Sequence, residues 1–294
     1  MFAVAGALLA NPACGSEDQG PNPGDGELLF ASNRIFGQFD VFVLDLADRS
    51  QLRLTDSLSF DFWPSWSFDG TRIVFQSDRG FNQDTVFDQD IYLMNADGTG
   101  AVQLTSDDST DSQPAWSPDG TKITFSSNRT GNYEIYVVNV DGTGLVRLTT
   151  HAAADGLPAW SPGGTRIAFA SDRDGDDEIF VMNATDGSGL VQLTTNTTAV
   201  DLAPAWSPDG TRIAFHSDST GNFAIYVMNA DGSGKTRLTA GGVPPQELAD
   251  WSPDGTRIAY DSDGDLFVLW LDGRGATRVA GNDQNAFFRP RWRP

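Results

Sequence analysis

Cysteine and histidine are almost absent from this sequence. Its 294 residues include one cysteine, Cys14, and two histidines, His151 and His216. A single cysteine excludes an internal disulfide framework. Two histidines are too few for a histidine-rich metal centre, and a zinc site also lacks ligands. No Gly-x-Ser-x-Gly pentapeptide occurs, which argues against a nucleophile of the α/β-hydrolase kind.

Basic residues are also scarce. The 19 Lys and Arg residues stand against 40 Asp and Glu residues, which gives a formal net charge of −21. Such a charge repels phosphate groups, so we expect no nucleic acid partner and no binding to an anionic membrane surface. The acid excess suits a basic peptide, an envelope protein with a basic surface, a cation, or solubility alone.

Long hydrophobic runs are missing, because no segment is apolar for long enough to span a membrane. Residues 2–10, FAVAGALLA, are nevertheless apolar, and Asn-Pro-Ala and then Cys14 follow them. This order is typical of the end of a bacterial lipoprotein signal, so we expect residues 1–14 to be a signal segment with Cys14 as the lipidation site. No basic residue precedes the apolar run, and a free cysteine in a disordered tail is the alternative.

The segment after Cys14 is polar and of low complexity. Residues 15–26 read GSEDQGPNPGDG, a composition that predicts a flexible tether. We therefore expect an exported protein, periplasmic or extracellular, that meets the membrane only through a lipid anchor.

What the sequence has in abundance is a repeat. The stretch PAWSPDGTRIAFHSD at residues 204–218 recurs in similar form four more times. The register is marked at spacings of 44 to 50 residues by Trp66, Trp116, Trp160, Trp206 and Trp251. A period in this range, with strand-like patterning and many Gly-rich turns, indicates a β-propeller.

Each repeat is predicted to form four short strands. PAWS and RIAF flank the tight turn PDGT, and strands such as EIYVVN and RLT follow after further turns. The C-terminal FFRPRWRP adds a lone first strand, whereas Glu27–Thr55 supplies a second, third and fourth. We therefore predict an all-β fold over residues 27–294. It is a monomeric six-bladed β-propeller of four-stranded antiparallel blades, and both termini close the last blade.

The recurring motif also resembles a known family. PAWSPDGTRIAF, followed by SDR, EIYVMNADGSG and RLT, is similar to the repeats of TolB-type six-bladed β-propellers. Such repeats also occur in propellers of the prolyl oligopeptidase and tricorn protease groups. The similarity covers the chain after the tether, but the additional N-terminal domain of TolB has no counterpart in it. The resemblance implies a propeller that binds other proteins of the cell envelope. We expect no cofactor, with a Ca²⁺ ion as the alternative.

Acidic residues recur five positions before the marker tryptophans. They are Asp61, Asp111, Asp155 and Asp201, and Glu247 lies next to the fifth such position. In the family the tryptophan strand is innermost, which would place these side chains at one mouth of a central channel. Clustered carboxylates repel each other unless a cation lies among them, so we expect partner binding there, with Trp63 as an apolar contact. A Ca²⁺ ion held by the four aspartates is one alternative. A structural role in the loop before each strand is another.

Other recurring polar residues are interpreted as architecture. The acidic turn SDRDGDDEIF at residues 171–180 corresponds to SNRTGNYEIY and SDSTGNFAIY in other repeats, which favours a solvated turn. His216 stands where other repeats carry Gln, Ser, Ala or Asp, a variety not expected of a catalytic residue. The arginines Arg34, Arg79, Arg129 and Arg173 are predicted to tie turns to neighbouring groups.

These features favour a non-enzymatic protein-binding scaffold of the bacterial cell envelope. The alternative is an enzyme, a calcium-assisted glycan lyase or a lactonase-like hydrolase that uses channel carboxylates. Departures from the repeat, such as the longer turn at residues 80–90, are the better pointers to function, because a unique site has to break the repeat.

Overall fold

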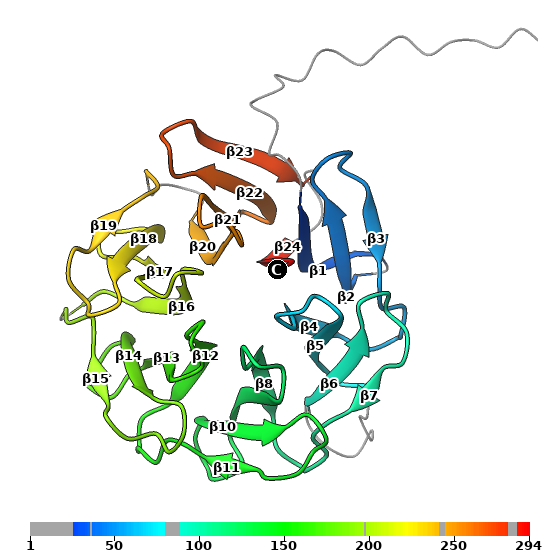
Figure 1. Cartoon of the computed structure of the whole chain (residues 1–294), viewed down its shortest axis with the longest axis horizontal. Helices are drawn as coiled ribbons and strands as arrows, with labels where there is room; N and C mark the ends of the chain where they lie inside the picture. The colour runs from blue at the N-terminus through cyan, green and yellow to red at the C-terminus, as the bar shows by residue number, and fades with distance from the viewer. Residues whose placement is uncertain (1–25, 36, 80–88, 197, 241–244, 282–286) are drawn as a thin grey trace, which may run out of the picture.

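Six four-stranded sheets surround a central axis like the blades of a propeller (Figure 1). The computed structural model describes residues 26–35, 37–79, 89–196, 198–240, 245–281 and 287–294. These ranges contain no helix, and hence no helix that could cross a membrane. The fold predicted from the sequence is confirmed.

The first two strands of each blade lie closest to the axis. The inner strands are β4 (Asp61–Trp66), β8 (Asp111–Trp116), β12 (Asp155–Trp160), β16 (Asp201–Trp206), β20 (Gln246–Trp251) and β24 (Phe287–Trp292). The second strands are β5 (Arg72–Ser77), β9 (Lys122–Ser127), β13 (Arg166–Ser171), β17 (Arg212–Ser217), β21 (Arg257–Ser262) and β1 (Glu27–Ile35).

The other two strands form the outer half of each blade. The third strands are β6 (Asp90–Asn95), β10 (Glu134–Asn139), β14 (Glu178–Asn183), β18 (Ala224–Asn229), β22 (Asp265–Trp270) and β2 (Gln38–Asp45). The fourth strands are β7 (Val102–Gln103), β11 (Val146–Arg147), β15 (Val191–Gln192), β19 (Thr236–Arg237), β23 (Gly275–Ala280) and β3 (Gln51–Arg53). Each of these four lists runs from blade one to blade six.

Blade six joins the two ends of the chain. Its sheet order is β24-β1-β2-β3, and Leu28 of β1 lies opposite Trp292 of β24. The backbone N–H of Arg293 also donates to the carbonyl of Glu27 at 2.9 Å. The C-terminal strand thus fills the innermost place of the blade that the N-terminal strands begin, which leaves no inner edge open there.

Apolar side chains fill the space between neighbouring blades. One cluster combines Val74 and Ile91 of blade one with Trp116 and Phe125 of blade two. The guanidinium of Arg72 in blade one lies 4.7 Å from the centre of the Trp116 ring, a cation–π contact across the blade junction. The same contact joins Arg212 to Trp251, Arg257 to Trp292 and Arg293 to Trp66.

In blades one, three and four the Gly-rich turn after the third strand lets the neighbouring blade approach closely. Gly98 has a φ of 84°, and a Cβ atom on it would lie 2.5 Å from the carbonyl oxygen of Leu54 in blade six. Only glycine fits this contact between blades, and Gly187 and Gly232 make the equivalent contacts with the carbonyl oxygens of Leu148 and Leu193.

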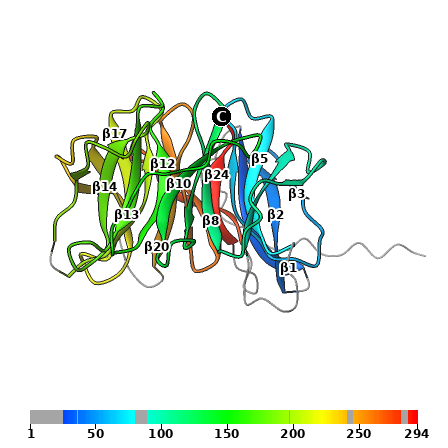
Figure 2. The ribbon, with the colours of Figure 1, turned by 90° about the horizontal axis from the view of Figure 1, so that it is seen from below.

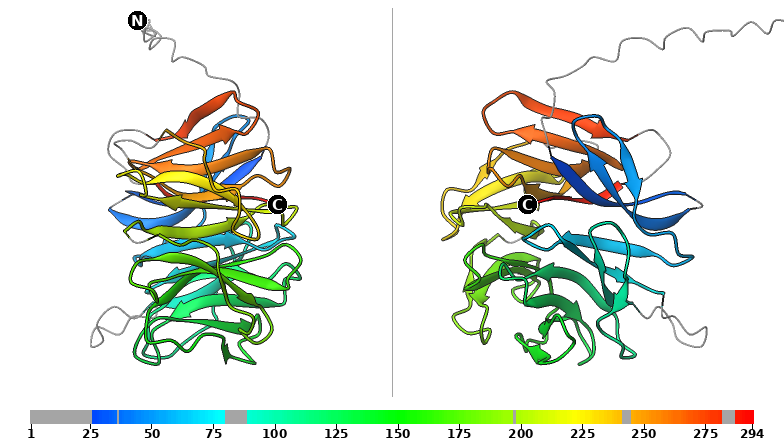
Figure 3. Two further views of the ribbon diagram at one scale, coloured as in Figure 1. Left: turned by 90° about the vertical axis from the view of Figure 1, so that its left-hand side faces the viewer. Right: turned by 45° about the vertical axis from the view of Figure 1, so that its right-hand side comes forward.

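The central channel has two different mouths. We call the end where the inner strands begin the start mouth. The other end is the tryptophan mouth, because a cavity of about 440 Å³ there is lined by Trp66, Trp116, Trp160, Trp206, Trp251 and Trp292. Figure 2 shows the strands crossing the thickness of the ring between the two faces, and Figure 3 shows the sheets following one another around it.

Turns of different kinds lie on the two faces. The repeated Ser-Pro-Asp-Gly and Asp-Gly turns follow the first and third strands, so they lie on the tryptophan side. Links between blades and the turns between second and third strands lie on the start side. Both described chain ends are on the tryptophan side, since Pro294 lines that cavity and Gly26 accepts a hydrogen bond from Leu46, just after β2.

Ring closure includes one ion pair that other blades lack. Asp250 of β20 and Arg291 of β24 take the place that is alanine in β8, β12 and β16, and their side chains meet at 2.9 Å. The second carboxylate oxygen of Asp250 accepts from the backbone N–H of Trp292, also at 2.9 Å. The two side chains are only 17% and 15% exposed.

We expect Asp250→Ala to lower the free energy of unfolding by about 3 kcal/mol, because it leaves the Arg291 charge and a backbone donor without their partner. Urea denaturation followed by tryptophan fluorescence measures this. The matched control is Asp272→Ala, which breaks an ion pair with Arg274 whose side chains are more than half exposed. That change should cost less than about 1 kcal/mol. Equal effects of the two variants would show that Asp250 has no special part in closure.

Candidate binding site at the start mouth

A backbone irregularity recurs in every inner strand near the start mouth. The third residue of each strand has a left-handed φ of 51° to 58°; these residues are Trp63, Gln113, Leu157, Ala203, Leu248 and Arg289. The pairing register with the second strand shifts there, as in a β-bulge. Six non-glycine residues in this strained conformation surround the channel, and we call them the bulge ring. Such strain is kept only where neighbouring groups hold it.

Side chains from the preceding blade hold several members of the bulge ring. The N–H of Gln113 donates to the amide oxygen of Gln76 at 2.9 Å, and the N–H of Leu157 donates to that of Gln113 at 2.8 Å. The N–H of Leu248 donates to Nδ1 of His216 at 3.2 Å. Burial lowers the pKa of His216 to about 3, so the imidazole is a neutral acceptor at physiological pH.

These holding residues were missed as a group by the sequence analysis. Gln76 and His216 occupy the same place in β5 and β17, where the variety of side chains was interpreted only as evidence against catalysis. The structure shows that different side chains reach the same target, a backbone N–H of the next blade. The signal is weak in the sequence because acceptors of several kinds serve equally well.

A cavity of about 390 Å³ opens beside the bulge ring. Its apolar wall includes Trp63, Leu157 and Leu202, and the amide side chains of Gln76, Gln89 and Gln113 supply polar groups. Tyr133 and Asp177, from the turns between second and third strands, complete one side. An apolar surface with a few amide groups suits a peptide-like segment, which offers both apolar side chains and backbone hydrogen bonds.

The four predicted aspartates are fully buried at the starts of their inner strands. Each pairs with a basic side chain of its own blade: Arg79–Asp61 at 2.6 Å, Arg129–Asp111 at 2.8 Å, Arg173–Asp155 at 2.7 Å and Lys235–Asp201 at 2.9 Å. Burial nevertheless raises the pKa of Asp61 and of Asp111 above its ordinary value.

The structure does not bring these four carboxylates together into a ring of free acids. Each carboxylate instead pairs with a basic side chain from a later turn of its own blade, and Arg79, Arg129 and Arg173 tie these turns as predicted. The side chain of Arg34 lies outside the described residues. Partner contacts and a Ca²⁺ ion at the four aspartates remain predictions.

The other two predicted contact residues lie nearer the channel. Trp63 belongs to the bulge ring, and the guanidinium of Arg289 lies 4.1 Å from the centre of its indole. Glu247 is half-buried and pairs in register with Asp261 of β21. Asp261 is buried, and both this burial and the nearby Glu247 charge raise its pKa well above the ordinary value.

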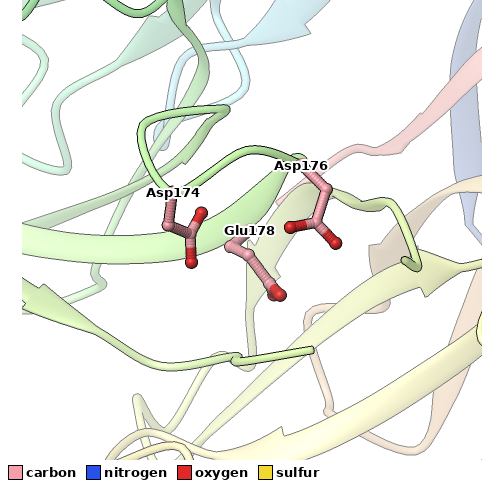
Figure 4. Close-up of side chains that lie close together, drawn as sticks. All are labelled: Asp174, Asp176 and Glu178. Atoms are coloured by element: carbon pink, nitrogen blue, oxygen red, sulfur yellow. The ribbon is translucent and has the colours of Figure 1, made fainter. Parts of the chain in front are cut away.

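Three acidic side chains do converge, at a place away from the four predicted aspartates. Among the described residues, one group of three acids has carboxylate oxygens within 4.8 Å of one another, and it consists of Asp174, Asp176 and Glu178. It lies on the turn between β13 and β14, outside the four predicted positions (Figure 4). Cys14, the predicted lipidation site, and most of the longer turn at residues 80–90 lie outside the described residues.

Fold and site together define a six-bladed β-propeller with a ligand-sized cavity at one end of its channel. Sequence comparison matches residues 151–268 and 189–294 to the TolB beta propeller domain, and residues 82–174 to the Tricorn protease N-terminal beta propeller domain. The protein is therefore a TolB-type six-bladed β-propeller.

Solved structures share this fold at low sequence identity. TolB from Acinetobacter baumannii is 22% identical with a TM-score of 0.77, over 92% of this chain and 68% of that one. A chain of a nidogen/laminin complex is 11% identical with a TM-score of 0.74, over 91% and 98%. Oligogalacturonate lyase from Vibrio parahaemolyticus is 16% identical with a TM-score of 0.58, over 86% and 74%.

We expect Asp111→Ala to lower the free energy of unfolding by about 3 kcal/mol, because it removes the buried partner of Arg129. The control is Asp107→Ala, which removes a 40% exposed carboxylate from the same guanidinium and should cost less than about 1 kcal/mol. Chemical denaturation of both variants measures the difference. Equal costs would contradict a structural role specific to Asp111.

Asp261→Asn should make the protein more stable at neutral pH. The raised pKa means that the folded state favours the protonated acid, so the wild type loses stability as the pH rises through the folded pKa of Asp261. Asparagine does not titrate. The stability of the variant relative to the wild type should therefore increase above pH 3.8, the ordinary pKa of aspartate, and the difference should vanish below that pH. Thermal unfolding from pH 3 to pH 8 tests this; a variant less stable than the wild type at pH 8 would show that Asp261 is ionised and well paired.

Proposed function

We propose that this protein is a non-enzymatic protein-binding scaffold of the bacterial cell envelope, and that it binds its partner at the start mouth. The observation that carries the proposal is the difference between the two faces. Repeated tight turns cover the tryptophan side, whereas the start side carries the bulge ring, the 390 Å³ cavity and the links that vary from blade to blade. Binding residues concentrate on variable loops that a rigid scaffold positions.

The chemistry of the start mouth suggests the kind of partner. Trp63 offers a large ring of a residue type enriched among binding hot spots. A formal net charge of −21 favours a partner with a basic surface or a basic peptide segment. The partner would insert an apolar side chain beside Trp63 and Leu157 while its backbone meets the amides of Gln76 and Gln113. Glu247 would supply a negative group near the rim.

Localisation forms part of the proposal. Export and a lipid anchor at Cys14 would follow from the signal-like residues 1–14, with residues 15–26 as the tether. Gly26, the first described residue, lies on the tryptophan side. An anchor attached through it would leave the start mouth directed away from the membrane and open to a partner.

Related folds support binding and also supply the competing function. One structural neighbour is a chain of a nidogen/laminin complex, and another is an oligogalacturonate lyase. A metal-dependent lyase or hydrolase needs ligands that converge in the channel. The four buried aspartates pair with their own blades instead, and among the described residues the carboxylates that converge lie on the turn before β14 and at its first residue.

Affinity capture from an envelope extract tests the proposal, with the full chain as bait and Trp63→Ala as the site variant. We expect the variant to retain at least tenfold less of a specific protein, while its unfolding temperature stays near that of the wild type. Phe68→Ala is the control, since Phe68 is 45% exposed and lines the tryptophan mouth. Loss of the captured protein with Phe68→Ala but not with Trp63→Ala would contradict the proposal and assign binding to the tryptophan mouth.

A further inference from the structure

In five of the six blades an acid near the start of the third strand pairs in register with a serine of the second strand. In four of these blades a fourth-strand side chain meets that acid: Arg53–Asp40 at 2.8 Å, Gln103–Asp90 at 2.7 Å, Arg147–Glu134 at 2.6 Å and Arg278–Asp265 at 3.0 Å. Arg147 and Arg53 occupy the same register position, opposite Tyr136 and Phe42. A donor at this position is therefore a regular part of the blade.

Blade three lacks this arrangement. Its acid, Glu178, is fully buried, and the register position opposite Phe180 holds Gln192, a glutamine as in blade one. The amide of Gln192 turns away and contacts Asp174. One oxygen of Glu178 accepts from the N–H of Asn196 at 2.5 Å, but the other, Oε2, is buried without a hydrogen-bond partner among the described residues. A buried acid oxygen without a partner costs free energy unless a ligand satisfies it.

The same blade has gained two acids beside Glu178. Asp174 and Asp176 stand where blade two has Thr130 and Asn132, and blade four has Thr and Asn as well. Oδ2 of Asp176 is also buried and has no hydrogen-bond partner in the described part of the chain. Figure 4 shows the Glu178 side chain between those of Asp174 and Asp176. Blade three thus has two additional carboxylates beside its buried acid, and its fourth-strand glutamine contacts one of them in place of that acid.

We propose that a calcium ion binds between Asp174, Asp176 and Glu178 and takes the place of the fourth-strand donor that meets the acid in four other blades. Three carboxylates this close repel each other until a cation lies among them. All three are oxygen ligands, which suit a hard cation and not zinc. Ca²⁺ accepts six to eight oxygens in flexible geometry, so water and the amide oxygen of Gln192, after rotation of that amide, can complete the shell.

The ion would also order one wall of the binding cavity. Asp177, between two of the proposed ligands, lines the start-mouth cavity. A calcium ion would fix the turn between β13 and β14 and hence the position of this residue. The site itself does not depend on the proposed function, because its argument rests on charges and contacts within blade three.

Calorimetric titration of the full chain with CaCl₂, after treatment with a chelator and at physiological salt, tests the site. We expect one saturable site, together with a rise in unfolding temperature. Asp176→Asn should weaken binding at least tenfold. Asp177→Asn removes the same charge from the same turn but no proposed ligand, and should change the affinity less than twofold. Equal losses in both variants would mean diffuse attraction by net charge and would overturn the proposal.

A second variant tests directly whether a fourth-strand donor can replace calcium. Gln192→Arg places a guanidinium where Arg147 meets Glu134 in blade two, and so should satisfy Glu178 without metal. We expect this variant to be folded, to lose calorimetric Ca²⁺ binding, and to unfold at a temperature that CaCl₂ does not raise. Wild-type affinity in Gln192→Arg would overturn the proposal. So would a wild type that shows no saturable binding, or one that binds MgCl₂ as tightly as CaCl₂.

Discussion

Contact between neighbouring blades is the constraint on which the rest of this structure depends. A single four-stranded blade cannot bury its own faces, so tryptophan, phenylalanine and isoleucine side chains of one blade pack against the next. Arginine side chains form cation–π contacts with tryptophans of the next blade. Glycines in the turns after third strands permit a close approach between outer strands. The last junction has to be made by the chain ends, and there Asp250 and Arg291 add an ion pair.

The repeat explains both what is structural and what is free to vary. Buried pairs such as Arg129–Asp111 recur with the blades and hold the turns around the start of each inner strand. The bulge ring recurs as well, yet it carries five different residue types in six blades. A regular backbone therefore presents an irregular set of side chains to the channel. This combination lets one architecture serve many ligands, because function resides in the site and not in the fold.

The blades could be predicted from the sequence because their determinants are local and repeated. Trp, Pro-Asp-Gly and Asp-Gly turns recur at fixed offsets, and the incomplete fragments at Glu27–Thr55 and the C-terminus complement each other. The role of Asp111 was harder to predict, since its partner Arg129 lies 18 residues away. The cluster around Glu178 was interpreted as a solvated turn, because the equivalent turns of other repeats carry Thr and Asn. That the Gln192 amide contacts Asp174 and leaves an oxygen of Glu178 without a partner among the described residues is visible only in the structure.

Photo-crosslinking in living cells most directly tests whether the start mouth is the binding face. A photoreactive amino acid would replace Leu202, which lines the start-mouth cavity, or Phe68, which lines the tryptophan mouth. Our account predicts a discrete protein adduct from position 202 and none from position 68. An adduct that forms only from position 68 would contradict it and would assign binding to the tryptophan mouth.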